Sequence, residues 1–151
     1  MSKTLQISDE EAMLALGRGL AARLQRGDLV ALSGDLGAGK TVLARGILKG
    51  LGYAGEVASP SYALVHPYDP PVVRLPVSHV DLYRLDDPAA LEELGLDEAR
   101  SYGALIVEWP DRADRRFVAD ALHIRIDRDG SAARRLTVDA ARSWEGRWPP
   151  R

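Results

Sequence analysis

Residues 34 to 41 read Gly-Asp-Leu-Gly-Ala-Gly-Lys-Thr, a complete G-x-x-x-x-G-K-[ST] phosphate-binding pattern. The apolar run Leu29-Val30-Ala31-Leu32 precedes it and a helical pattern follows it. Its three glycines can adopt backbone conformations closed to other residues, so that successive N–H groups turn toward a phosphate at the start of the helix. The stretch therefore predicts a strand–loop–helix unit that binds a nucleoside triphosphate.

The loop also predicts individual roles. Lys40 is expected to reach the β- and γ-phosphates and to serve catalysis, and the Thr41 hydroxyl is expected to ligate Mg²⁺. A purely structural glycine-rich turn would leave Lys40 without a purpose. The sequence has no Asn-Lys-x-Asp segment for guanine, which favours ATP over GTP. The residues expected to bind the nucleotide are Asp35, Leu36, Gly37, Ala38, Gly39, Lys40, Thr41 and Val42.

Composition limits the remaining possibilities. A chain of 151 residues with 46% hydrophobic content predicts one globular domain, taken here as residues 1–142, with a polar tail at 143–151. The absence of cysteine excludes disulfides and thiolate metal sites, and a formal charge of −2 argues against a strong attraction to nucleic acid. No apolar stretch approaches the length of a membrane span or resembles a secretion signal, so a cytoplasmic location is expected.

Periodicity predicts the flanking elements. A capping box at 8–11 begins a helix that Gly27 would stop, and a second helix is expected over 40–51. Apolar alternation at 121–126 and 134–138 around Asp129-Gly130 predicts a hairpin at the sheet edge. The tail from Ser143 is expected to fray or to dock only through Trp144 and Trp148.

Glu108 ends the apolar run Ala104-Leu105-Ile106-Val107, which is typical of a central strand covered on both faces. The carboxyl ends of such strands form the ligand-binding edge of α/β sheets, where phosphate-loop proteins keep the acid that serves Mg²⁺. Glu108 is therefore a candidate metal ligand. In the alternative interpretation it caps a nearby helix or pairs with an arginine.

Asp81 competes for the same role. Residues 77–84 alternate as a strand does, which places His79, Asp81 and Tyr83 on one face. A carboxylate beside an imidazole can orient a water or support a metal, so Asp81 is a candidate catalytic residue. The alternative is a polar strand face exposed to solvent.

Three further segments have weaker signals. The loop residues Ser59 and Ser61 lie where switch segments sense a γ-phosphate, although a plain turn explains them equally well. The arginines at 112, 115 and 116 are assigned to a charged helix surface rather than to an arginine finger. The D-x-x-G match at 127–130 falls in the expected hairpin turn and is read as coincidence.

Several segments, taken in order, resemble one family. They are the phosphate loop at 34–41, Arg45-Gly46, Ser59-Pro60-Ser61-Tyr62, His79-Val80-Asp81-Leu82-Tyr83-Arg84-Leu85, Leu94-Gly95 and Val107-Glu108-Trp109-Pro110. Together they are similar to TsaE, formerly the YjeE family, the small ATPase of bacterial tRNA threonylcarbamoyladenosine synthesis. The H-x-D-L-Y-R segment combined with a strand ending in Glu-Trp is far more specific than the phosphate loop alone.

The resemblance implies a single P-loop NTPase domain of the α/β class, with a mixed sheet and helices on both faces; the hairpin adds an antiparallel edge. It implies binding of ATP and Mg²⁺ and action on the TsaB–TsaD complex, so that tRNA is reached only indirectly. Carried onto this sequence, Thr41 and Glu108 would hold Mg²⁺, and Lys40 and the loop amides would hold the phosphates. Asp81 would support the metal or the attacking water.

The chain departs from the family pattern at three positions. Ser61 replaces a common threonine and keeps the hydroxyl. Val42 replaces a common hydroxyl residue, so a side-chain contact to the α-phosphate is lost. Met13 stands where the family often has threonine near the adenine, which leaves an apolar contact to the base.

Three functions share these features. The first is an Mg-ATP hydrolase that acts as an accessory subunit, with weak turnover alone. A small-molecule kinase would share the loop but would normally add an acceptor pocket and an arginine-bearing lid, for which no segment is long enough. A third is a nucleotide-gated binding module in which ATP orders residues 53–76 for docking.

Overall fold

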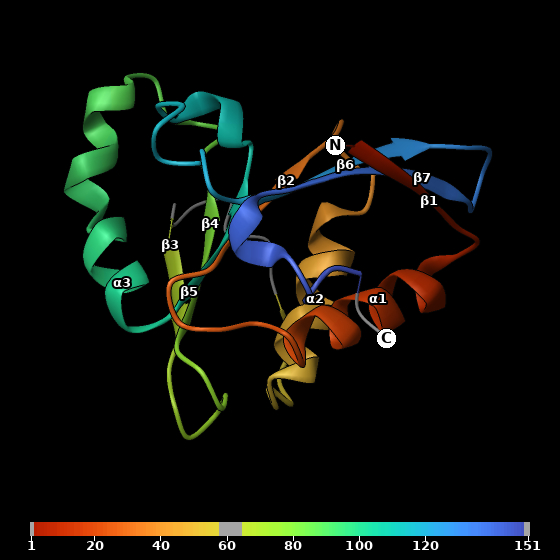
Figure 1. Cartoon of the computed structure of the whole chain (residues 1–151), viewed down its shortest axis with the longest axis horizontal. Helices are drawn as coiled ribbons and strands as arrows, with labels where there is room; N and C mark the ends of the chain where they lie inside the picture. The colour runs from red at the N-terminus through yellow and green to blue at the C-terminus, as the bar shows by residue number, and fades with distance from the viewer. Residues whose placement is uncertain (1, 58–64, 150–151) are drawn as a thin grey trace.

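The computed structural model describes residues 2–57 and 65–149. Within this part of the chain the strands of one sheet are interspersed with helices and short 3₁₀ turns (Figure 1). The strands are β1 (Ser2–Ile7), β2 (Leu29–Ser33), β3 (Val65–Tyr68), β4 (Val77–Asp81), β5 (Ala104–Glu108), β6 (Leu122–Arg128) and β7 (Arg134–Ala140). The helices are α1 (Glu10–Ala21), α2 (Lys40–Gly50) and α3 (Leu96–Tyr102), with 3₁₀ turns η1 (Pro88–Leu94), η2 (Pro110–Arg112) and η3 (Arg142–Trp144).

The described strands form a seven-stranded mixed sheet in the order β1-β7-β6-β2-β5-β4-β3. β2 runs parallel to both β5 and β6, and β4 runs parallel to β5. β3 is antiparallel to β4 at one edge, and toward the other edge β7 is antiparallel to both of its neighbours, β6 and β1. The predicted α/β domain with a mixed sheet and an antiparallel edge is confirmed, and the sheet has such an edge on both sides.

Alternate residues of β2 point to opposite faces of the sheet. Val30 and Leu32 join the apolar cluster that contains α1 and α2, whereas Leu29 and Ala31 join the cluster that contains Leu96 of α3. Both sets are buried. Helices therefore cover both faces of the sheet, as expected (Figure 1). β2, which leads directly into the phosphate loop, is packed from both sides.

Helices α1 and α2 lie side by side on one face, and glycines allow their backbones to touch (Figure 1). A Cβ built on Gly17 would lie 2.7 Å from the Cα of Gly46 and 2.7 Å from the carbonyl oxygen of Leu43. These neighbours are backbone atoms, which cannot rotate away. The close approach fixes the position of α2, whose first residue is Lys40 of the phosphate loop.

We expect Gly17→Ala to lower the free energy of unfolding by about 2 kcal/mol, because the added methyl group would force the two helices apart. Thermal unfolding followed by circular dichroism would measure the loss as a drop of roughly 5 °C. Gly19→Ala is the matched control, since Gly19 lies in the same helix but is partly exposed. Alanine there should be neutral or stabilising, by up to about 1 kcal/mol. Equal stability of the two variants would contradict the close helix contact.

One expectation about the sheet and two about a helix need correction, and one strand was not predicted. The sequence patterns did not predict β1, and the hairpin of β6 and β7 is not at the edge, because β6 pairs with β2 and β1 covers β7. Alternation identifies a strand but not its neighbours. Asp9 rather than Ser8 is the N-cap of α1, where its Oδ1 accepts a hydrogen bond from the Ala12 amide at 2.9 Å. That helix ends at Ala21, well before Gly27.

The described part of the C-terminal tail packs on the core. Trp144 is buried in the same cluster as α1 and α2. The Arg147 guanidinium lies over its ring at 4.2 Å and donates hydrogen bonds to both carboxylate oxygens of Asp28, at 2.6 and 3.0 Å. A bidentate pair at this depth ties the tail to the turn before β2.

The segment containing Ser59 and Ser61 lies outside the described residues, so its proposed switch role stays a prediction.

Candidate functional site

Three parallel strands end side by side at one edge of the sheet. Glu108, the last residue of β5, is in register with Asp81 at the end of β4 and with Leu32 near the end of β2. The phosphate loop begins directly after β2. The two acids that compete for the metal role are therefore brought together beside the loop, as expected for the carboxyl edge of a parallel sheet.

The loop has the backbone conformation that its glycines were expected to supply. Gly34, Gly37 and Gly39 have φ values of 144°, 78° and 118°, all outside the range comfortable for other residues. At Gly34 a Cβ would also lie 2.5 Å from the carbonyl oxygen of Ile126. Helix α2 begins at Lys40 with no side-chain hydrogen bond at its N-cap, Gly39. Its first amides are therefore free of a side-chain cap, an arrangement suited to an anion.

Lys40 is buried at the centre of this edge. Its ammonium donates hydrogen bonds to the carbonyl oxygens of Gly34, at 2.5 Å, and Asp35, at 3.0 Å, and lies 4.4 Å from the centre of the Trp109 ring. Burial lowers the pKa of Lys40, and the negative charges of Glu108 and Asp81 offset only part of this shift. The site thus holds a desolvated cation where the phosphates of a nucleotide would bind.

Trp109 contributes to the site in a way that the sequence analysis missed. It has φ 59° and ψ 53°, which makes it the only non-glycine residue with positive φ among the described residues. Such a conformation costs of order 1 kcal/mol or more and persists only where its surroundings impose it. Here the backbone is held by a hydrogen bond from the Trp109 amide to the Leu32 carbonyl, and the ring packs against Tyr83 at 4.9 Å. The sequence signal that could have indicated this role of Trp109 is the Glu-Trp-Pro segment at the end of a buried strand.

Glu108 and His79 form a buried pair, with 2.6 Å between Glu108 Oε2 and His79 Nε2. The alternation of residues 77–84 predicted the imidazole beside Asp81; in the structure it is instead bonded to Glu108 on the neighbouring strand. His79 Nδ1 is buried and has no hydrogen-bond partner among the described residues. With a proton on Nε2, the imidazole donates a hydrogen bond to the carboxylate, which fixes the orientation of Glu108.

Asp81 is buried too, so the alternative of a solvent-exposed polar strand face is wrong. Its Oδ1 accepts a hydrogen bond from the Tyr83 amide at 2.9 Å. Burial raises the pKa of Asp81, the Tyr83 amide opposes the shift, and the charge of Glu108 adds to it. A carboxylate with a raised pKa is a better proton acceptor than a carboxylate with the ordinary pKa of aspartate.

Most of the predicted residues line one cavity of about 290 Å³. It is bounded by Leu36, Gly37, Gly39, Lys40, Thr41, Val42, Asp81, Glu108 and Trp109. Two predicted nucleotide-binding residues do not line this cavity: Asp35 and Ala38 border a polar depression, and Ala38 also lines the second pocket described below. Asp35 still serves the site through its backbone, because its carbonyl accepts from both Lys40 and the Ala38 amide.

The donors around this cavity fit Mg²⁺. Thr41, Asp81 and Glu108 offer a hydroxyl and two carboxylates, all oxygen ligands, which Mg²⁺ prefers. Over the described ranges, no group of three or more His, Asp or Glu side chains is placed to hold a metal without help. Mg²⁺ commonly binds through one or two side chains, substrate phosphates and water, so the arrangement suits a nucleotide-borne ion.

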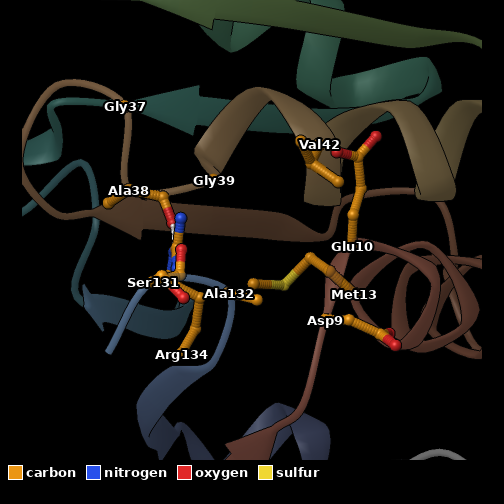
Figure 2. Close-up of a pocket in the computed structure, with 10 residues that line it drawn as sticks. All are labelled: Asp9, Glu10, Met13, Gly37, Ala38, Gly39, Val42, Ser131, Ala132 and Arg134. Atoms are coloured by element: carbon orange, nitrogen blue, oxygen red, sulfur yellow. Dashed lines mark hydrogen bonds between the residues drawn. The ribbon is translucent and has the colours of Figure 1, made fainter. Parts of the chain in front are cut away.

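A second pocket, of about 360 Å³, adjoins the loop (Figure 2). It shares Gly37, Gly39 and Val42 with the first cavity and is closed by the start of α1 and by the turn between β6 and β7. Met13 of α1 extends into it (Figure 2). The remaining lining residues are Asp9, Glu10, Ala38, Ser131, Ala132 and Arg134. The two pockets therefore adjoin one another along the phosphate loop.

Comparison with known proteins agrees with this geometry. Residues 7–136 match the family described as threonylcarbamoyl adenosine biosynthesis protein TsaE. The chain belongs to the TsaE family. The match begins at the last residue of β1 and ends within β7, so it spans both pockets and all three strand ends.

Individual TsaE relatives are similar over most of their length. The tRNA threonylcarbamoyladenosine biosynthesis protein TsaE of Streptomyces coelicolor is 46% identical over 122 residues, which cover 77% of this chain and 79% of the relative. The protein of the same name from Haemophilus influenzae is 41% identical over 132 residues, covering 83% and 82%. The chain therefore contains most of what a TsaE protein comprises.

A solved structure supports the TsaE fold as well. The crystal structure of Bacillus subtilis YdiB superposes with a TM-score of 0.75 at 30% sequence identity, over 95% of this chain and 88% of that one.

Over the residues that the structure describes, no helix combines the length and apolar character that a membrane span needs.

Proposed function

We propose that this chain binds and hydrolyses Mg-ATP as an accessory subunit for tRNA N6-threonylcarbamoyladenosine modification, acting in the cytoplasm on the TsaB–TsaD complex. The observation that carries the proposal is the single cavity in which Lys40, Thr41, Asp81 and Glu108 meet at the carboxyl edge of the sheet. The biosynthetic role follows the names of the relatives. In this proposal tRNA is reached through the partners.

In the proposed complex the phosphates of ATP occupy the 290 Å³ cavity, and the nucleoside enters the adjoining pocket against Met13. Loop amides and the Lys40 ammonium bind the phosphate oxygens. Thr41 and Glu108 hold Mg²⁺, which neutralises charge that develops on the phosphates. His79 keeps the Glu108 carboxylate oriented.

Asp81 is proposed to orient the attacking water or to support the metal. Its burial and raised pKa suit a group that accepts a hydrogen bond from water and takes up a proton. Leu36 is exposed at the cavity rim and Tyr83 is exposed beside Trp109, so one side of the site is open. A site that admits bulk water does not hold one water in line for attack, which explains the weak turnover expected of the chain alone.

The decisive experiment measures phosphate release from Mg-ATP by the chain alone and with TsaB and TsaD added. We expect turnover to rise at least about tenfold, because groups supplied by a partner to a phosphoryl-transfer site raise rates by such factors or more. Unchanged turnover with tight ATP-dependent association would favour a nucleotide-gated module. Label from γ-phosphate recovered on a small metabolite would favour a kinase. Either result would contradict the proposal.

A further inference from the structure

Two arginines from the β6–β7 hairpin donate hydrogen bonds to carbonyl oxygens of the phosphate loop. Arg128 Nη2 donates to the Gly37 oxygen at 3.0 Å, and Arg134 Nε donates to the Ala38 oxygen at 2.8 Å. The two arginines are directly opposite one another in the register of the hairpin. They come from a segment about ninety residues further along the chain than the loop they contact.

Arg134 also ties the loop to the turn of its own hairpin. Its Nη1 donates to the carbonyl oxygen of Ala133 at 2.9 Å and contacts that of Ser131 at 3.5 Å. Ser131 and Ala132 form a wall of the 360 Å³ pocket beside the loop (Figure 2). One guanidinium therefore links the backbone of the phosphate loop to the wall of the adjoining pocket.

These bonds determine where the loop amides point. In a planar trans peptide the C=O and N–H groups face opposite ways. With the Ala38 carbonyl turned toward Arg134, the Gly39 N–H points to the opposite side, and Gly39 borders both pockets. Arg128 likewise fixes the peptide before Ala38, whose N–H closes the loop by donating to the Asp35 carbonyl at 3.1 Å.

The space around Gly37 shows how closely the loop and the hairpin fit. A Cβ at Gly37 would lie 2.7 Å from Arg128 Nη2, which is the movable end of a side chain, so it is the φ of 78° that requires glycine here. A left-handed glycine-rich loop has many alternative conformations in solution. External bonds to two successive carbonyls restrict it to one, so less ordering has to accompany ligand binding.

We infer that Arg128 and Arg134 are positioning residues that hold the phosphate loop in its binding conformation from behind, without touching the phosphates themselves. The inference rests on the proposed function, because it assigns these arginines to the affinity of the same site for phosphates. Arg134 also borders the nucleoside pocket, and direct recognition of the nucleoside by its guanidinium is the rival interpretation.

Calorimetric titration of ADP and of inorganic pyrophosphate separates the two interpretations. Arg134→Gln should weaken both ligands by the same factor, about tenfold, because the loop amides bind the phosphates that the two ligands share. Arg134→Lys, which can still donate one hydrogen bond to the Ala38 oxygen, should recover part of the affinity for both. Arg128→Gln should act in the same direction with a smaller factor, since its bond is longer and more exposed.

Arg125→Gln is the matched control, since Arg125 lies on the same strand as Arg128 and forms an exposed ion pair with Asp127. Arg125→Gln removes the same charge without removing a hydrogen bond to the loop, and it should leave both affinities within about twofold. Hydrogen exchange of the ligand-free proteins gives a second readout. The Ala38 amide should exchange faster in Arg134→Gln and Arg128→Gln than in wild type or the control.

Unchanged pyrophosphate affinity with weakened ADP binding would overturn the inference and show that Arg134 reads the nucleoside. Wild-type affinity for both ligands, or wild-type exchange at Ala38, would also overturn it. If Arg134→Gln does not fold, Arg134→Lys carries the test, with the same requirement of equal loss for both ligands. A wild-type protein that binds neither ADP nor pyrophosphate would instead refute the proposed function.

Discussion

A Lys40→Met variant is expected to lose ATP affinity at least about a hundredfold, because in the proposed complex the Lys40 ammonium donates charge-assisted hydrogen bonds to two phosphates. The same change should leave the nucleotide-free protein as stable as wild type, or more so. Burial lowers the pKa of Lys40, so the charged form is less favourable in the folded chain than in the unfolded one. This penalty is present below the folded pKa and disappears as the pH rises above the unfolded value. Isothermal titration and calorimetric unfolding at pH 7 measure the two effects.

Lys49→Met is the control for this prediction. Lys49 is exposed in the last turn of α2, so removing its charge should change stability by no more than about 0.5 kcal/mol and leave ATP binding intact. ATP binding by Lys40→Met at the wild-type level would refute the phosphate role. A large fall in its unfolding temperature would show instead that the bonds to Gly34 and Asp35 stabilise the loop more than burial of the cation destabilises it.

The parts of the site that sequence could predict are those set by local rules. A glycine-rich loop of this pattern between a buried strand and a helix is typical of phosphate binding. An acid directly after an apolar run, as Glu108 is after residues 104–107, marks the same sheet edge. Both predictions needed only the order of residues along the chain. The structure places Lys40, Asp81 and Glu108 around one cavity, as these patterns indicated.

The parts that sequence could not predict depend on which segments become neighbours. β1 is mostly polar, and its position beside β7 moves the hairpin away from the edge. The pairing of β6 with β2 places Arg128 and Arg134 behind the phosphate loop, and periodicity within the hairpin does not reveal this neighbour. The pairing of His79 with Glu108 has the same origin, because it crosses from β4 to β5.

The site is thus assembled from three layers of support. The strands set the positions of Glu108 and Asp81, the contact between α1 and α2 sets the start of the helix at Lys40, and the hairpin arginines set the loop between them. Trp109 closes the arrangement by crossing from the end of β5 to the Lys40 ammonium in a strained backbone conformation. Each layer comes from a different part of the chain, and all three lie within residues 7–136, which match the TsaE family.

Glu108→Gln is expected to remove most of the contribution of Mg²⁺ to ATP binding, so that ATP affinity in the presence of Mg²⁺ falls at least about tenfold. Turnover should fall about a hundredfold. Glutamine keeps an oxygen that can accept the hydrogen bond from His79 Nε2, so the fold should be unaffected. Glu108→Ala should show the same loss of Mg²⁺ dependence together with a stability loss of about 1–3 kcal/mol, because the buried imidazole loses its partner. Titration of ATP with and without Mg²⁺, combined with thermal unfolding, separates the two effects.

Asp81→Asn decides between the two acids. If Glu108 is the direct ligand, the Asp81 variant should retain most of the Mg²⁺ dependence of ATP binding and lose turnover, since Asp81 then acts on the water. Electron paramagnetic resonance of Mn²⁺ bound with ATP gives a readout independent of catalysis, and the spectrum should change in Glu108→Gln but little in Asp81→Asn. The reverse pattern would transfer the metal to Asp81. Glu108, held by His79 in the more deeply buried position, would then serve only to orient its neighbours.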